Sequence, residues 1–172
     1  GSEMCIRDRL DEASGEVEVA LSETRIQFTI GTMRLTSKLI DGTFPDYDRV
    51  IPRGNDKILR VDKKDFNDAV GRVSAISAEK HRPVKLSLAK ELLVISAASA
   101  EQGSASEELG GDLVDYQSGP LEIGFQARYL SDVTDQIKSG KVEFAFADGA
   151  APTLVREEND SSAVYVLMPM RV

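Results

Sequence analysis

The sequence predicts an α+β domain in which a β-α-β-β-β unit occurs twice, preceded by a short all-β segment. Apolar and polar residues alternate along most of the chain, as half-buried strands require. Residues 62–77 and 126–140 instead place apolar residues at helical spacing, and each segment directly follows a strand-like run. We therefore expect two helices packed side by side on antiparallel sheets, each covering one face of its sheet.

Residues 1–12 do not share the pattern of the rest of the chain. They show no alternation, their Gly-Ser start is typical of a cloning remnant, and the run SEMCIRDR resembles translated sequencing-adapter sequence. The alternative is a short native segment without regular structure. In both cases this leader is excluded from the predicted fold.

A short all-β segment follows the leader. Its three alternating runs are VEVAL (17–21), TRIQFTI (24–30) and MRLTSKLI (33–40), and Gly31-Thr32 predicts a hairpin turn between the last two. Three strands are too few for a stable domain, so residues 13–44 are expected to be the last strands of a domain that begins upstream. Proline, glycine and aspartate then interrupt the alternation between residues 41 and 56, and we place a connector at 45–56.

The first copy of the repeated unit begins at residue 57. The run KILRV (57–61) predicts a strand, and Asp62 is a suitable N-cap for the helix that follows. Apolar residues recur along one face of this helix, at Phe66, Ala69, Val70, Val73 and Ile76. Three further strands are expected at 84–88, at 92–96 and, with a polar sequence, at 104–116. A hairpin turn is expected at 89–91.

The second copy begins at residue 121. The run LEIGF (121–125) predicts a strand, and the helix after it is expected to end at Gly140. Strands are then expected at 141–147, 152–158 and 163–170. Aligning the two helices matches Phe66 with Leu130, Asp68 with Asp132, Ala69 with Val133 and Val73 with Ile137. This agreement indicates an internal duplication, and chance similarity of two amphipathic helices is the alternative.

Composition limits the possible functions. The 172 residues carry 21 Lys and Arg against 29 Asp and Glu, a formal net charge of −8. This balance disfavours a protein coated with DNA or anionic lipid but leaves room for a local basic face. No apolar run approaches the length of a membrane span, and no signal-peptide pattern is present. The single Cys cannot form an internal disulfide, which fits a reducing cytoplasm.

Motifs for catalysis are missing from the sequence. It contains no HExxH, CxxC, GxSxG or phosphate-binding GxxxxGKS motif. The one histidine, His81, lies in the loop-like run EKHRP. Carboxylate-based catalysis stays open in principle, but no pair of acidic residues stands out from the solvated surface charge. A non-catalytic protein is therefore the main expectation, and a small hydrolase or transferase is the alternative.

Two further motifs lie at opposite ends of the duplicated region. The segments TSKLIDGTFPDYDRVIP (36–52) and YVLMPMRV (165–172) together resemble the bacterial DNA polymerase III β subunit family, the sliding clamps. The duplicated unit is similar to the domain architecture of that family, and the resemblance covers residues 15–172. It implies the DNA-clamp fold, with 13–44 as the last strands of a middle domain and 57–172 as a complete C-terminal domain. The first domain and most of the middle domain are then absent.

The resemblance implies a role in DNA replication without catalysis and without a cofactor. In this family two chains close head to tail into a ring around duplex DNA, and the ring keeps a polymerase on its template. The implied partners are double-stranded DNA and, through short linear motifs, the DNA polymerase III catalytic subunit, the clamp loader and repair polymerases. This chain alone is not expected to close the ring. A free-standing peptide-binding module is the alternative.

The resemblance also assigns residues to three sites. A hydrophobic groove for partner peptides is implied for Pro45, Arg49, Val50, Pro152, Val166, Leu167, Met168, Pro169, Met170 and Arg171, with a second wall from the missing part of the middle domain. DNA-facing positions on the helices are implied for Lys64, Arg72, Arg128 and Lys138, and a subunit interface for Ala75, Ile76, Glu107 and Glu108. Methionine side chains can repack around different partners, although alternate residues of the last strand can instead pack in the core.

Overall fold

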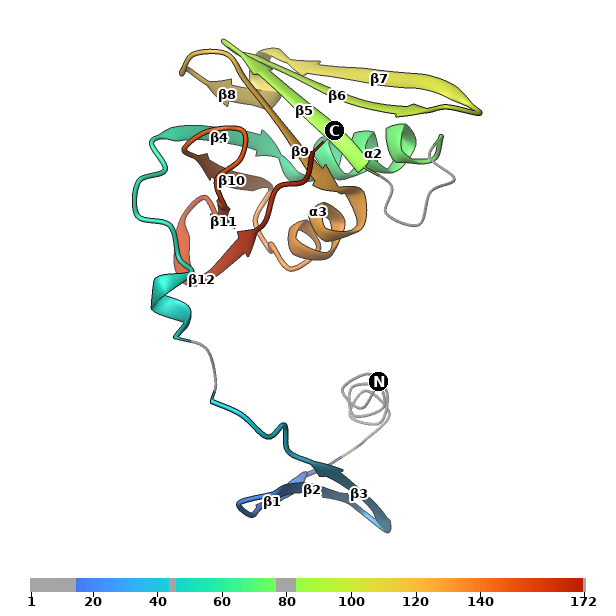
Figure 1. The fold of residues 1–172 in the computed structure, drawn as a ribbon, viewed down its shortest axis with the longest axis vertical. Coiled ribbons are helices and arrows are strands. Elements are labelled where there is room, and N and C mark those ends of the chain that lie inside the picture. The colour runs from blue at the N-terminus through green and yellow to red at the C-terminus, as the bar shows by residue number, and fades with distance from the viewer. Residues whose placement is uncertain (1–14, 44–45, 77–82, 172) are drawn as a thin grey trace. The chain divides into compact units, whose positions relative to one another are not determined.

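The structure, a computed structural model, describes residues 15–43, 46–76 and 83–171. Its contacts divide the chain into two compact units, with the boundary between Pro45 and Asp46. Figure 1 labels the helices and strands of both units. The leader at 1–12, Pro45 and the single histidine lie outside the described residues.

The first unit is a three-stranded antiparallel sheet. Its strands are β1 (Glu18–Leu21), β2 (Arg25–Ile30) and β3 (Met33–Lys38), in that spatial order. Gly31 has a φ of +57°, which suits the two-residue turn between β2 and β3. The predicted strands and hairpin are therefore confirmed. Within the described part of this unit every residue is exposed or half-buried, so the sheet has no interior of its own.

The second unit opens with a short 3-10 helix, η1 (Tyr47–Arg49), followed by a segment without regular secondary structure. Strand β4 (Lys57–Asp62) then leads directly into helix α2 (Lys63–Ser74). The Asp62 carboxylate accepts hydrogen bonds from the backbone N–H groups of Lys64 at 2.9 Å and Asp65 at 3.1 Å. This contact confirms the predicted N-cap, because it satisfies N–H groups that the first helical turn leaves unpaired.

Three strands follow α2 and pair in sequence order, namely β5 (Pro83–Ala89), β6 (Leu92–Ser99) and β7 (Gly103–Gly110). The prediction of one continuous strand over 104–116 is wrong. A 3-10 turn, η2 (Gly111–Leu113), separates β7 from β8 (Val114–Tyr116), and the two strands belong to different sheets. Gly111 has a φ of +62° at this switch, a conformation that glycine adopts without steric cost.

The second half of the unit repeats the strand-helix-strand order. It contains β9 (Leu121–Gln126), α3 (Ala127–Thr134), β10 (Lys141–Phe146), β11 (Thr153–Glu157) and β12 (Asp160–Leu167). The expectation that the helix continues to Gly140 is wrong, because α3 ends at Thr134. The Thr134 hydroxyl donates to the carbonyl oxygen of Leu130 at 2.9 Å. Ile137 is still buried, but it reaches the core from the turn after the helix.

The two halves exchange their first strands. The five-stranded sheet has the order β12-β11-β10-β4-β8, and the four-stranded sheet has the order β7-β6-β5-β9. Strand β4 of the first half thus pairs with β10 of the second, and β9 of the second pairs with β5 of the first. These reciprocal pairings agree with the predicted internal duplication.

The helices lie side by side and share one core with both sheets (Figure 1). Phe66 and Leu130, which the sequence alignment of the halves pairs, are both fully buried. The Phe66 ring packs against Phe144 of β10 with ring centroids 5.2 Å apart. Burial of these side chains is the main stabilising term for the unit, because apolar area removed from water dominates folding free energy.

The end of the chain repeats the sheet switch seen at β8. Strand β12 ends at Leu167, so the strand predicted at 163–170 is too long at its C-terminal end. The backbone N–H of Met170 then donates to the carbonyl oxygen of Gly124 on β9 at 2.9 Å. In the first half, Asp115 of β8 pairs with Arg60 at the matching position of β4. The chain therefore leaves one sheet and joins the edge of the other in both halves.

Candidate partner-binding pocket and helix face

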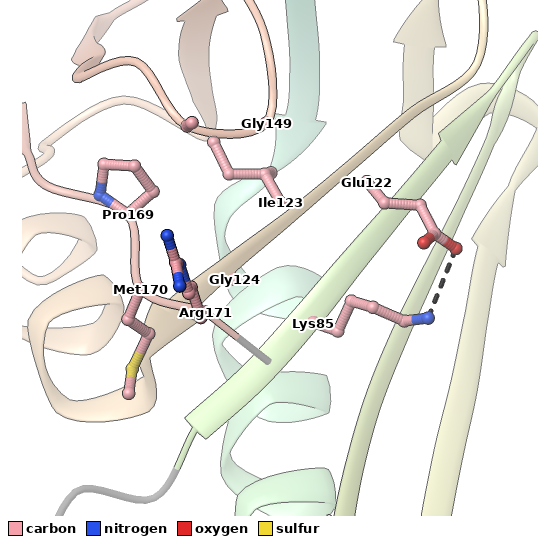
Figure 2. A pocket seen from close by; sticks show the side chains of 9 residues that line it. Lys85, Glu122, Ile123, Gly124, Gly149, Pro169, Met170 and Arg171 are labelled. Atoms are coloured by element: carbon pink, nitrogen blue, oxygen red, sulfur yellow. Dashed lines mark hydrogen bonds and ion pairs between the residues drawn. The ribbon is translucent and has the colours of Figure 1, made fainter.

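The last described residues border a hollow on the second unit. It has a volume of about 480 Å³, and Pro169, Met170 and Arg171 of the tail line it. Figure 2 shows the tail on one side of this hollow and the ion pair between Lys85 and Glu122 on another. The remaining lining residues are Ile123, Gly124, Gly149 and Ala150. The tail therefore forms a wall of a surface pocket against β5 and β9.

Alternation along β12 decides which tail side chains face outward. Leu167 is buried in the core, whereas Met168 is 62% exposed. Val166 and Met170 are half-buried. Pro169 has no N–H to donate to a strand ladder, and the hydrogen bond to β9 is made by the next residue instead. The predicted groove residues thus divide into one core residue and several accessible ones.

A tight loop closes another side of the pocket. The Asp148 carboxylate accepts the backbone N–H groups of Ala150 and Ala151, each at 2.8 Å. These hydrogen bonds lower the pKa of Asp148, because they stabilise its charged form. A Cβ at Gly149 would lie 2.4 Å from the carbonyl oxygen of Glu122. The loop can approach β9 this closely only with glycine at that position.

Sequence reasoning missed the wall that β5 and β9 contribute. Lys85 Nζ lies 3.2 Å from Glu122 Oε1, and the Ser87 hydroxyl donates to the same oxygen at 3.2 Å. The pairing of β5 with β9 brings Lys85 opposite Gly124. No local sequence pattern signals this wall, because it depends on the pairing of β5 with β9, which belong to different halves of the repeat.

The connector residues lie elsewhere in the described structure. Arg49 and Val50 are exposed at η1, with Arg49 Nε 3.1 Å from Asp46 Oδ2, and they are not among the residues lining the tail pocket. Pro152 is half-buried, and its carbonyl oxygen accepts the Asn55 side-chain amide at 2.9 Å. Asn55 also donates to the carbonyl oxygen of Ala145 at 2.7 Å. Asn55, which sequence reasoning missed, thus fixes the connector to the five-stranded sheet.

Cations on the two helices occur in matching ion pairs. Lys64 Nζ lies 2.6 Å from Asp68 Oδ2, and Arg128 Nε lies 3.5 Å from Asp132 Oδ2. Each cation is the second residue of its helix, and each acid follows four residues later. The hydrogen bond between Lys64 and Asp68 raises the pKa of the lysine and lowers the pKa of the aspartate. All four side chains are exposed.

The other two predicted DNA-facing cations differ from this pattern. The Arg72 guanidinium, near the end of α2, contacts Glu107 of β7 through two nitrogen atoms. Lys138 lies in the turn after α3, so its predicted place on the second helix is wrong. Its backbone N–H donates to the Glu157 carboxylate at 3.0 Å. The helix face therefore carries mixed charge, with most of its cations already paired.

The predicted interface residues lie along one edge of the unit. Ala75 is the exposed C-cap of α2, and Ile76 is half-buried against the core. Strand β7 is an edge strand of the four-stranded sheet, and it carries Glu107 and Glu108. Glu107 is half-buried toward Arg72, whereas Glu108 is exposed. An unpaired strand edge is able to pair with another chain.

Within residues 15–43, 46–76 and 83–171, no group of three or more His, Cys, Asp or Glu residues is arranged to hold a metal ion. No helix in the same part of the chain is long and apolar enough to cross a membrane.

Comparisons with known proteins agree with the resemblance. The family model described as "DNA polymerase III beta subunit, C-terminal domain" matches residues 48–171, and the central-domain model of the same subunit matches residues 5–46. This chain belongs to the DNA polymerase III beta subunit family. Among curated members, the beta sliding clamp of Caulobacter vibrioides (strain NA1000 / CB15N) is 50% identical over 165 residues and that of Pseudomonas aeruginosa is 42% identical over 163 residues. In both comparisons the match covers 95% of this chain and 44% of the relative.

Solved sliding clamps share the fold. A sliding clamp from Bartonella birtlesii bound to griselimycin matches with a TM-score of 0.86 and 46% identity, over 96% of this chain and 44% of that chain. A DNA polymerase sliding clamp from Caulobacter crescentus matches with a TM-score of 0.86 and 47% identity, over 97% of this chain and 44% of that chain. The expected DNA-clamp fold is therefore confirmed, and the chain spans less than half the length of these relatives.

Proposed function

We propose that this chain is part of a replicative sliding clamp, a processivity factor that encircles duplex DNA and tethers a polymerase to it. The membership of the beta subunit family, together with the duplicated fold, carries this proposal. The protein has no catalysis of its own in this function, and polymerase activity belongs to a partner. It acts in the cytoplasm. The ring is a homodimer of the full-length protein, and this chain is not expected to close it.

Duplex DNA is the proposed partner of the helix face. The cations Lys64, Arg72, Arg128 and Lys138 would contact phosphates and not bases, which gives binding without sequence preference and with strong dependence on salt. The net charge of −8 leaves the protein as a whole repelled by DNA. A weakly basic inner surface on an acidic protein suits a ring that slides and does not stick.

Short peptide motifs of the polymerase III catalytic subunit, the clamp loader and repair polymerases are the proposed partners of the tail. The exposed Met168 and the half-buried Met170 offer unbranched side chains that can adapt to several partners. Arg171 is exposed beside them and can pair with an acidic group of the peptide. Arg49, Val50 and Pro152 are proposed to extend this groove from the connector side.

The edge formed by β7 and the end of α2 is the proposed subunit interface. Ala75, Ile76, Glu107 and Glu108 lie there, and the free edge of β7 would pair with the neighbouring chain of the ring. The two glutamates favour a basic partner surface.

Fluorescence polarization of a labelled peptide containing a glutamine and a Leu-Phe pair tests the groove. Met168→Ala removes an exposed side chain at the tail and should weaken peptide binding about tenfold, as loss of one apolar anchor does. Met33→Ala on β3 is the matched control, because it removes another exposed methionine far along the chain. Absence of saturable binding to the chain, or equal binding by both variants, would contradict the proposed groove.

A further inference from the structure

We propose that Asp68 and Asp132 are exchangeable partners of the helix cations Lys64 and Arg128. Each aspartate releases its cation when a DNA phosphate takes the place of the aspartate carboxylate. The inference rests on the proposed function of the helix face. It adds a regulatory role for the two aspartates, which lower the affinity of that face for DNA. The ion pairs of Lys64 with Asp68 and of Arg128 with Asp132 carry the argument.

The same cation–aspartate pair occurs in both halves of the duplicated domain. Strands β4 and β9 end at matching positions, so α2 and α3 begin in the same register. In each helix the second residue is the cation and the sixth is the aspartate. The cation type differs between the halves, but the spacing and the order of charges do not.

The order of charges argues against helix stabilisation as the main role of these pairs. An acid placed N-terminal to a base at this spacing stabilises a helix better than the reverse order. Here both helices have the reverse order, with the base in the first turn, where the helix dipole disfavours a positive charge. Asp132 also lies in the last turn of the eight-residue α3, where the dipole disfavours a negative charge.

Exposure makes these pairs easy to open. The Lys64 side chain is 81% exposed and the Arg128 side chain is 75% exposed, and each touches its aspartate at a single point. Exposed ion pairs of this kind contribute little to stability. A phosphate brought close by a ring around the duplex can therefore displace either aspartate.

Other charged contacts on the same face are built differently. Arg72 holds Glu107 through two nitrogen atoms, and the half-buried Glu107 side chain is 28% exposed. Asp135 accepts the Asn67 side-chain amide at 3.0 Å, across the two helices. These contacts join separate elements, whereas the Lys64 and Arg128 pairs lie within single helices and can open without moving the backbone.

The consequence is a face with adjustable positive charge. With both pairs closed, two cations are neutralised. Each exchange presents a cation to a phosphate and leaves an aspartate nearby that repels the DNA. Contacts of this kind break as easily as they form, which favours sliding.

The test is binding of a labelled DNA duplex to the 172-residue chain, measured by fluorescence anisotropy over a range of salt concentrations. The double variant Asp68→Asn/Asp132→Asn should bind DNA about tenfold more tightly at low salt, or about threefold for each pair removed. It should also show a steeper fall of affinity with salt, because two cations are permanently free to meet phosphates. Asparagine keeps the size of both exposed side chains, and a thermal unfolding curve checks that the fold is kept.

The matched control is Asp41→Asn/Asp112→Asn. It changes the net charge equally, at exposed positions that lie outside α2 and α3. Equal DNA affinity for the two double variants would overturn the proposal, since the gain would then be a general charge effect. Weaker or unchanged binding by Asp68→Asn/Asp132→Asn would also overturn it.

A second variant separates this inference from the proposed function. Lys64→Ala/Arg128→Ala should weaken DNA binding and reduce its salt dependence. If this variant loses affinity while the aspartate variant gains none, the helix face binds DNA but the exchange does not occur. If the cation variant binds DNA as the unaltered chain does, the DNA-binding role of these cations fails, and the exchange fails with it.

Discussion

Arg72 of α2 and Glu107 of β7 form a two-point ion pair, with Arg72 Nε 3.0 Å from Glu107 Oε2 and a second contact from Nη2 to Oε1. The pair joins a cation proposed to face DNA with an acid proposed to face a neighbouring subunit. The hydrogen bond from Arg72 lowers the pKa of Glu107, and the same hydrogen bond raises the pKa of Arg72. The helix face and the strand edge are thus linked electrostatically.

This link predicts a loss of stability in acid. The pKa of Glu107 is lowered from 4.5 in the folded chain, so the unfolded chain binds the proton more readily. The contribution of the pair to the free energy of unfolding is therefore complete above about pH 4.5 and lost as the pH falls through the folded pKa. Urea unfolding at about pH 5 and about pH 3 should show this decrease, and Glu107→Gln should reduce it.

Glu108→Gln is the control for this measurement. It removes the same charge from the next residue of β7, which is not an ion-pair partner of Arg72 within the described structure. An equal effect of the two substitutions on the pH dependence would show that the pair with Arg72 is not responsible.

The N-caps of the two helices predict an asymmetry between the halves. Asp62 accepts two backbone N–H groups of α2, whereas Gln126 makes no side-chain hydrogen bond at the start of α3 in the described structure. Asp62→Ala should therefore lower the free energy of unfolding by about 1 kcal/mol. Gln126→Ala, at the matching position, should change it by less than about 0.5 kcal/mol. Thermal and urea unfolding measure both, and equal losses would contradict the assignment of the cap.

A row of charges crosses the five-stranded sheet and predicts a sensitive position. Glu143 of β10 is only 2% exposed and accepts hydrogen bonds from Arg60 at 2.9 Å and Arg156 at 2.6 Å. Arg60 also lies 3.3 Å from Asp115 of β8. Glu143→Gln would leave two arginines without their shared charge and should lower the free energy of unfolding by about 2 kcal/mol.

Asp115→Asn tests whether burial decides this cost. Its side chain is half exposed at the end of the same row, so its loss should lower the free energy of unfolding by less than about 1 kcal/mol. Urea unfolding of both variants gives the comparison. A larger loss at Asp115 than at Glu143 would refute the role assigned to burial.

The loop beside the tail pocket predicts a steric effect. Gly149→Ala would place a Cβ 2.4 Å from the Glu122 backbone, so the loop must move away from β9. The substitution should cost about 1–3 kcal/mol of stability, as overpacking does. Gly54→Ala is the control, because an added Cβ there meets nothing within 4 Å. Unfolding curves that coincide for the two variants would show that the loop adjusts without cost.

Local sequence was sufficient for most of the individual elements. Alternation identified the strands on both sides of Gly31, and helical spacing identified α2 with Asp62 as its cap. These features depend on residues close together in the chain.

Two errors in the predicted element bounds have local causes. The run Gly110-Gly111 marked the break between β7 and β8, and Thr134 ended α3 while the apolar pattern continued to Ile137.

The positions of the sites required longer-range information. Apolar periodicity tells which face of a strand is buried, but not which strand lies beside it. The sequence therefore did not place Lys85 and Glu122 beside Met170, nor Arg72 against Glu107.

The sequence by itself determined the family, the two amphipathic helices, the duplication and the adaptable character of the tail. The tertiary structure decided the exchange of first strands between the halves, the pairing of the tail with Gly124 and the ion pair between Arg72 and Glu107. The physical reason is the range of the interactions. Periodicity and capping act over one or two turns of chain, whereas strand neighbours and ion-pair partners are chosen when distant segments compete to bury the same core.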